Sequence, residues 1–241
     1  MIPLRDANPT RRAPLVTLIL IAACFIAFAW ELGVLASSGE SGLNRFLTEH
    51  GAVPADVSRG LGSRQLASDA SLGVLTSLFL HGGWLHLLGN MLFLWIFGNN
   101  VEDRLGRPAF LVFYLVGGIA AALTQVAIDP TSTVPVIGAS GAIAATLGAY
   151  VVLYPRARIL SLVFLGFFYQ LIEVPALLVL GFWFVLQLID GIASLGLSSA
   201  TEGGVAFFAH IGGFVVGLLV ALAIRARRPG PPRPLRPATV G

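Results

Sequence analysis

The chain has 241 residues, of which 56% are hydrophobic and only 11% are charged, and its mean hydropathy is +0.85. This composition excludes an ordinary soluble domain and predicts an integral membrane protein. The net charge of +3 comes from arginines alone, and these cluster at the ends of apolar segments. That placement suits membrane orientation better than nucleic-acid binding. The single cysteine, Cys24, excludes an intramolecular disulfide.

Apolar segments predict one membrane domain over residues 14–224, folded as an all-α bundle of six spanning helices with a short buried fourth helix. The six helices are predicted over residues 14–36, 78–101, 108–128, 140–154, 174–190 and 205–224.

The remaining segments are predicted to be tails and loops. Residues 1–13 form an arginine-bearing N-terminal tail that we expect to be mobile. The loop 37–75 is polar, and its segment Leu43–His50 has the pattern of an amphipathic helix at the interface. Residues 159–172 are apolar and predicted to be partly interfacial or re-entrant, whereas 225–241, rich in Pro and Arg, is predicted to be disordered.

Arginines predict the orientation of the bundle. They lie in the N-terminal tail, after the second and fourth helices, and in the C-terminal tail, which all fall on one side of a six-helix topology. By the positive-inside rule this side is the cytoplasm. The exceptions, Arg45, Arg59 and Arg64, lie in the long first loop, where the rule is weak. We therefore expect both termini to be cytoplasmic, in the plasma membrane of a prokaryote.

Polar residues of three predicted helices lie at a similar depth. Counting from the arginines at the inner face, Ser140 lies roughly 24 Å, His210 roughly 22 Å and Asn90 roughly 21 Å above it, with His86 one turn further out. Such groups are costly in lipid and should face the bundle interior or a water-filled cavity. Small residues around Ser140 also suit close helix packing, but the shared depth favours a polar site.

This set of residues permits acyl transfer. Ser140 is a candidate nucleophile and His210 its candidate base. We expect no acidic residue at this depth, so a Ser–His dyad is favoured over a triad. The Ser140 N–H and the side chains of Asn90 and His86 are candidate donors to an oxyanion. Histidines and an asparagine without a carboxylate or thiolate do not make a persuasive metal site.

Four motifs resemble those of the rhomboid family of intramembrane serine proteases. Gly138-Ala139-Ser140-Gly141 resembles its Gly-x-Ser-Gly nucleophile motif. The other three are a histidine–glycine motif on the last helix, a histidine–asparagine motif on the second helix and the turn after it. The histidine–glycine motif comprises Ala209, His210, Gly213 and Gly217, and the histidine–asparagine motif comprises His81, His86 and Asn90. The turn comprises Glu102, Arg104, Leu105 and Gly106.

The resemblance implies a Ser140–His210 dyad that needs no cofactor and cleaves transmembrane protein substrates near the outer boundary of the bilayer. It also implies that His86 and Asn90 help to bind the oxyanion, while Gly213 and Gly217 let the sixth helix pack closely on the fourth. Some members carry an aromatic residue where this chain has Ala144, so His210 is expected to be oriented otherwise, by Phe207 or Phe208, or to be held less tightly. The first loop also lacks a Trp-Arg pair found in some members.

Two alternatives remain open on the sequence. The first is a non-catalytic protein of the same fold that binds transmembrane clients, although such a protein need not retain Ser140, His210 and Asn90 together. The second is a small transporter, which the lack of internal repeats and of intramembrane acids or arginines disfavours.

Overall fold

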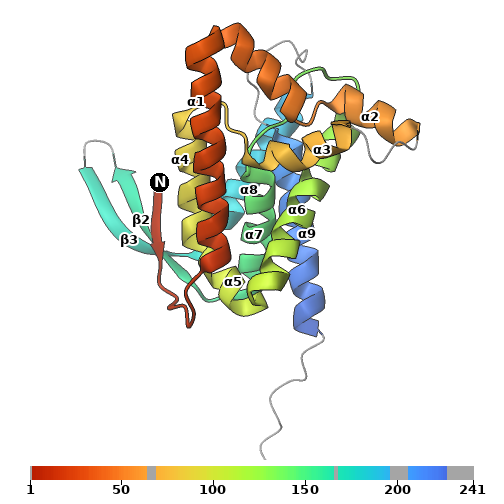
Figure 1. Ribbon diagram of the computed structural model, residues 1–241. Helices are drawn as coiled ribbons and strands as arrows, with labels where there is room; N and C mark the ends of the chain where they lie inside the picture. Colours follow the sequence, from red (N-terminus) through yellow and green to blue (C-terminus); the bar gives the residue numbers. More distant parts are fainter. Residues whose placement is uncertain (1, 64–68, 166–167, 196–205, 227–241) are drawn as a thin grey trace, which may run out of the picture.

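The computed structural model describes residues 2–63, 69–165, 168–195 and 206–226, and this part is a bundle of helices with one small sheet (Figure 1). The helical elements are α1 (Leu15–His50), α2 (Pro54–Gly62), α3 (Asp69–Thr76), η1 (Ser77–Phe79), α4 (Trp84–Phe93), η2 (Leu94–Gly98), α5 (Asn99–Leu105), α6 (Arg107–Ile128), α7 (Ser140–Leu153), α8 (Ala176–Ser194) and α9 (Phe207–Ala226). The predicted fold class, an apolar helical bundle with a short buried fourth helix, is confirmed.

Helix α7 lies in the middle of the bundle, with α6, α8 and α9 around it (Figure 1). Every residue from Gly141 to Tyr150 is buried, because α7 is apolar on all its faces and small residues allow its neighbours to approach closely. With 14 residues, α7 is too short to cross a bilayer alone. Other helices therefore surround it completely.

Within the described residues, four helices are long and apolar enough to span a membrane: α1, α6, α8 and α9. A fifth candidate is a pair of helical stretches, 70–79 and 84–105, bent by 78° at the break between them. The predicted second helix thus begins at Trp84 rather than Leu78, and it continues past Val101 to Leu105 through a π-helical turn at Leu94–Gly98. The count of six spans stays a prediction.

The first helix is longer than predicted. α1 continues past Ala36 to His50, with a break at Gly39, whose φ of 66° lies in the left-handed region that favours glycine. The segment Leu43–His50 is helical, as expected. The rest of the predicted polar loop contains α2 and α3, so it is largely helical rather than irregular.

One end of the bundle gathers the segments that carry arginines. The Glu102 carboxylate accepts the N–H groups of Val16 and Thr17, at 3.0 and 2.8 Å, and so caps the N-terminus of α1. Nearby, Arg107 donates to the Ala13 carbonyl and Arg225 to the Val152 carbonyl. Among the described residues, Arg107 and Arg225 thus lie at the end of the bundle where the N-terminal segment enters α1. The gathering of all the arginine-bearing segments on one side, and the assignment of that side to the cytoplasm, stay predictions, because residues 227–241 lie outside the described part.

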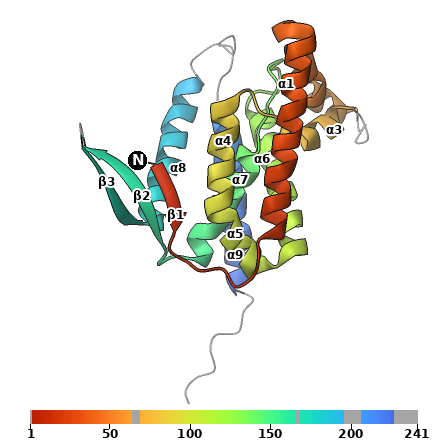
Figure 2. The same ribbon diagram turned by 60° about the vertical axis from the view of Figure 1, so that its left-hand side comes forward.

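A three-stranded antiparallel sheet, which the sequence analysis did not predict, lies beside the bundle. It consists of β1 (Ile2–Asp6), β2 (Arg158–Leu165) and β3 (Phe168–Pro175), in the order β1-β2-β3. Figure 2 shows the β2–β3 hairpin rising alongside α8. Residues 159–172 thus form paired strands, which suits their β-branched and aromatic residues, and their interfacial or re-entrant position stays a prediction.

The N-terminal tail is likewise not mobile over its described part. β1 pairs with β2, and the Asp6 carboxylate accepts hydrogen bonds from the Tyr150 hydroxyl at 3.0 Å and from the Asn100 side-chain amide. Burial raises the pKa of Asp6. At the other terminus, Arg225 belongs to α9 rather than to a tail. The predicted disorder of 227–241, and the predicted loop at 196–204, lie outside the described residues.

Candidate active site

Ser140 is the first residue of α7 and follows a sharply turned backbone. Gly138 has a φ of 121°, which a residue with a side chain rarely adopts, and its N–H donates to the Ser77 carbonyl at 2.8 Å. The Ile143 N–H makes the first helical hydrogen bond of α7, to the Ala139 carbonyl. The N–H groups of the first turn of α7 therefore lack intrahelical acceptors and can serve a negatively charged oxygen.

His210, in the first turn of α9, lies directly against this serine. Its Nε2 is 2.8 Å from the Ser140 Oγ, and its Nδ1 is 2.6 Å from the Gln187 Oε1. An amide oxygen only accepts, so Nδ1 carries the proton and donates it to Gln187. Nε2 is then free to accept the hydroxyl proton of Ser140. This tautomer is the one that a general base requires.

Two residues of α8 hold the imidazole of His210. Gln187 binds Nδ1, and the Trp183 ring lies 5.9 Å from the imidazole, centroid to centroid, at an angle of 38°. Residues four apart share one face of a helix, so α8 presents both to His210. The expectation that Phe207 or Phe208 orients His210 is wrong: in the described part of the chain the ring contact comes from Trp183. A glutamine inside an apolar helix was the signal in the sequence that pointed to this role.

His86 and Asn90 lie on α4, and His86 reaches the loop before Ser140. A Cβ added at Gly138 would lie 2.7 Å from the His86 Nε2 and 3.5 Å from the Ser140 Oγ, so only glycine leaves room for both side chains. The Asn90 side chain donates to the His86 carbonyl at 3.0 Å and is almost fully buried. The four candidate residues therefore come from α4, α7 and α9, with His86, Ser140 and His210 brought together.

Glycines allow α7 and α9 to approach until their backbones touch. A Cβ at Gly213 would lie 2.2 Å from the Gly141 carbonyl oxygen, and one at Gly217 would lie 1.8 Å from the Ala145 carbonyl oxygen. Gly141 also packs on α6, because a Cβ there would lie 2.6 Å from the Ala121 Cβ. The close approach of α7 and α9 sets the distance between Ser140 and His210.

A buried acid lies beside His81, a residue of the segment between η1 and α4. His81 is only 1% exposed, and its ring lies 5.1 Å from that of His86. Its backbone N–H donates to the Glu31 carboxylate at 3.0 Å. Glu31 is 2% exposed and is thus a buried acid in α1, whereas the partner that orients His210 is Gln187, which is not an acid. Glu31 is the only acid within the predicted first helix, 14–36, and this was the signal in the sequence.

Comparison with known proteins places the chain in a family. Residues 69–227 match the model of the Rhomboid domain. The chain is 33% identical over 159 residues to the Rhomboid protease GluP of Bacillus subtilis, and 30% identical over 158 residues to Rhomboid protein 1, mitochondrial, of Saccharomyces cerevisiae. It is 31% identical over 152 residues to Rhomboid-like protein 11, chloroplastic, of Arabidopsis thaliana.

These alignments cover 65%, 62% and 61% of this chain but only 27%, 41% and 50% of the respective relatives. The chain thus spans half or less of the length of the relatives it matches. Two of these relatives are named for mitochondria or chloroplasts, so the prokaryotic plasma membrane and the orientation of the termini stay predictions. The matched domain and the apolar helices show a multi-pass integral membrane protein. The chain belongs to the rhomboid family.

Proposed function

We propose that this protein is an intramembrane serine endopeptidase that hydrolyses peptide bonds of transmembrane protein substrates near the outer boundary of the bilayer, without a cofactor. One observation carries the proposal: the Ser140 Oγ lies 2.8 Å from the Nε2 of a histidine whose Nδ1 is bound to Gln187. A serine hydroxyl is a weak nucleophile until an adjacent base accepts its proton, and this arrangement supplies that base.

The reaction proceeds through an acyl-enzyme. His210 accepts the Ser140 proton as Oγ attacks the scissile carbonyl, and the resulting imidazolium then protonates the leaving amine. A water molecule, deprotonated by the same Nε2, attacks the ester and restores Ser140. Gln187 accepts a hydrogen bond from Nδ1 throughout, so that Nε2 always faces the reacting atoms.

Three groups are the expected donors to the oxyanion of each tetrahedral intermediate: the Ser140 N–H and the side chains of His86 and Asn90. The Ser140 N–H has no intrahelical acceptor, and the His86 Nε2 lies beside Gly138. The Asn90 amide has two N–H groups, of which one donates to the His86 carbonyl and the other is available. These three groups support the predicted roles of His86 and Asn90 as oxyanion donors.

The strongest alternative is a non-catalytic rhomboid-like protein that binds transmembrane clients. Such a protein needs a binding surface but no base at hydrogen-bond distance from a serine. The alternative therefore predicts that Ser140 is chemically inert.

Labelling with a fluorophosphonate probe distinguishes the two functions. The full chain in detergent is expected to be labelled at Ser140, and the label is expected to disappear in Ser140→Ala and His210→Ala. Ser37, an exposed serine of α1, supplies the control, because Ser37→Ala should be labelled like the wild type. A folded, monodisperse wild type that takes no label would refute the peptidase. Cleavage of a transmembrane peptide in liposomes then separates a peptidase from another acyl hydrolase.

Gln187 is expected to act as a positioning residue. Gln187→Leu removes a hydrogen bond to a histidine that becomes charged in the reaction, and such bonds contribute about 1.5–3 kcal/mol. We expect kcat to fall about ten- to a hundredfold with little change in KM. Gln187→Glu keeps an acceptor for Nδ1 and should restore most of the rate, whereas Gln170→Leu on the exposed strand β3 should have no effect. Equal losses in the Leu and Glu variants would contradict this role.

A further inference from the structure

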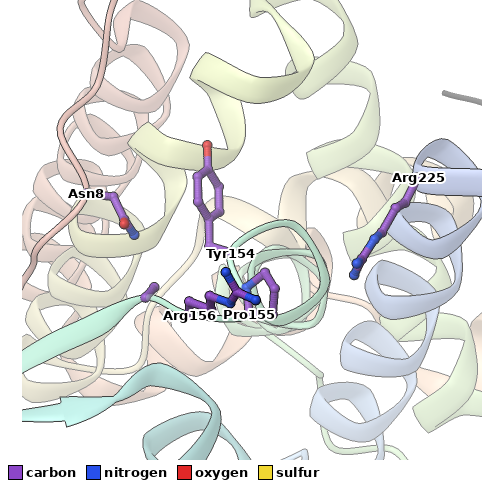
Figure 3. Close-up of a pocket in the computed structure, with 6 residues that line it drawn as sticks. Asn8, Tyr154, Pro155, Arg156 and Arg225 are labelled. Carbon is purple, nitrogen blue, oxygen red and sulfur yellow. The ribbon is translucent and has the colours of Figure 1, made fainter. Parts of the chain in front are cut away.

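A cavity opens at the end of the bundle opposite the Ser140–His210 pair. It has a volume of about 350 Å³ and is lined by Asn8, Tyr154, Pro155, Arg156, Ala157 and Arg225 (Figure 3). Three separate parts of the chain meet there: the N-terminal segment, the end of α7 and the end of α9. The volume lies within the range of about 300–1,000 Å³ that is typical of small-molecule sites.

The cavity carries positive charge that no carboxylate neutralises. Its lining contains two arginines and no acid, and neither guanidinium forms an ion pair with any described residue. Two acids nearby form no ion pair with either arginine: Asp6 accepts a hydrogen bond from the Tyr150 hydroxyl, and Asp103 accepts one from the Arg11 backbone N–H. The charge is therefore available to a ligand.

Helix capping uses only some of the hydrogen-bond donors of these two arginines. Arg225 donates one hydrogen bond, of 3.5 Å, to the Val152 carbonyl at the end of α7. A guanidinium has five N–H donors, so most of those of Arg225 remain. Arg156 has no hydrogen bond to any described residue. Two planar guanidinium groups that line one cavity and form no ion pair with a described residue suit the oxygens of a phosphate group better than a single carbonyl.

The position of the cavity indicates where such a phosphate comes from. α7 and α9 carry Ser140 and His210 at their first turns and line the cavity at their last residues. The 15 residues from His210 to Arg225 correspond to roughly 22 Å of helix, so the cavity lies near the opposite face of the bilayer. Phospholipid headgroups are concentrated at that level, and basic pockets between membrane helices bind anionic headgroups.

We propose that Arg156 and Arg225 form a binding site for a phosphate group, supplied by the headgroup of an anionic phospholipid. The bound headgroup bridges the ends of α7 and α9, which are the two helices that hold the Ser140–His210 pair at their other ends. Binding therefore stabilises the packing of these two helices. The inference does not depend on the proposed peptidase activity.

Thermal unfolding of the full chain in a neutral detergent tests this site. Phosphatidylglycerol is expected to raise the unfolding midpoint in a saturable manner, whereas phosphatidylcholine is not. One arginine near an anionic membrane surface contributes enough to change affinity about fivefold. Arg156→Gln and Arg225→Gln should therefore each need about fivefold more phosphatidylglycerol to reach half of the wild-type shift.

Arg158→Gln is the matched control. Arg158 lies two residues from Arg156, but it pairs with Glu173 at 3.3 Å and does not line the cavity. It should respond to phosphatidylglycerol like the wild type. Inorganic phosphate, added in place of the lipid, distinguishes the two sources of the phosphate group. A rise in the unfolding midpoint with phosphate alone, which Arg156→Gln abolishes, supports the same site with free phosphate as its ligand. Equal shifts with both lipids, or an undiminished shift in both arginine variants, would overturn the proposal.

Discussion

Ser140→Ala is expected to lower the turnover of a transmembrane peptide by about 10⁴-fold or more, and His210→Ala by a similar factor. The reason is that the hydroxyl and the imidazole act as one unit: without the base the hydroxyl keeps its proton, and without the hydroxyl the base has nothing to activate. The 2.8 Å contact between Oγ and Nε2 places the two in this relation. The measurement is the initial rate of cleavage in liposomes.

The double variant Ser140→Ala/His210→Ala provides the sharper test. If the two groups form a dyad, the double variant retains about the same rate as either single variant, because the first substitution already abolishes the shared step. If each residue only supported the fold, the losses would add on a logarithmic scale. Thermal unfolding midpoints of all three variants should stay near that of the wild type, which excludes loss of folded protein as the cause.

Gly217→Ala is expected to have the largest effect on folding. The added Cβ would lie 1.8 Å from the Ala145 carbonyl oxygen, and backbone atoms cannot move aside as a flexible side chain can. Overpacking of this kind costs about 1–3 kcal/mol and occasionally more, and the severity of this overlap predicts the upper end. α9 must move away from α7, which separates His210 from Ser140. We therefore expect a lower unfolding midpoint together with slower probe labelling.

Gly181→Ala in α8 is the control for this effect. No atom lies within 4 Å of a Cβ at Gly181, so the change adds a good helix former without a clash. Alanine is favoured over glycine in a helix by about 0.8–1.0 kcal/mol, so the midpoint should stay level or rise slightly. A Gly217→Ala variant as stable and as reactive as Gly181→Ala would contradict close packing of α7 on α9.

The sequence located the candidate site because polar residues in apolar helices are costly and must converge. Helical rise alone put Ser140, His210 and Asn90 at one depth, and the structure brings Ser140 and His210 into hydrogen-bond contact. The same rule applied to Gln187 and Glu31, but neither belongs to a motif. Their partners lie on other helices, and helical periodicity does not say which helices are neighbours.

The sheet was not predicted from the sequence, for a different reason. Residues 159–172 are apolar, and a short apolar run does not distinguish a membrane segment from a strand. β2 pairs with β3 in a local hairpin, but its other partner is the N-terminal segment Ile2–Asp6, more than 150 residues away in the chain. Only such a long-range contact makes the N-terminal tail a strand and carries Asp6 to Tyr150.

Composition, hydropathy and local spacing thus determined by themselves that this is a helical membrane protein with a serine and a histidine at one depth, because burial in lipid constrains each segment separately. The tertiary structure decided which groups meet: Gln187 with His210, Glu31 with the His81 backbone, and Arg156 with Arg225 around one cavity. These contacts join segments distant in the chain, and they depend on how closely glycines let the helices approach.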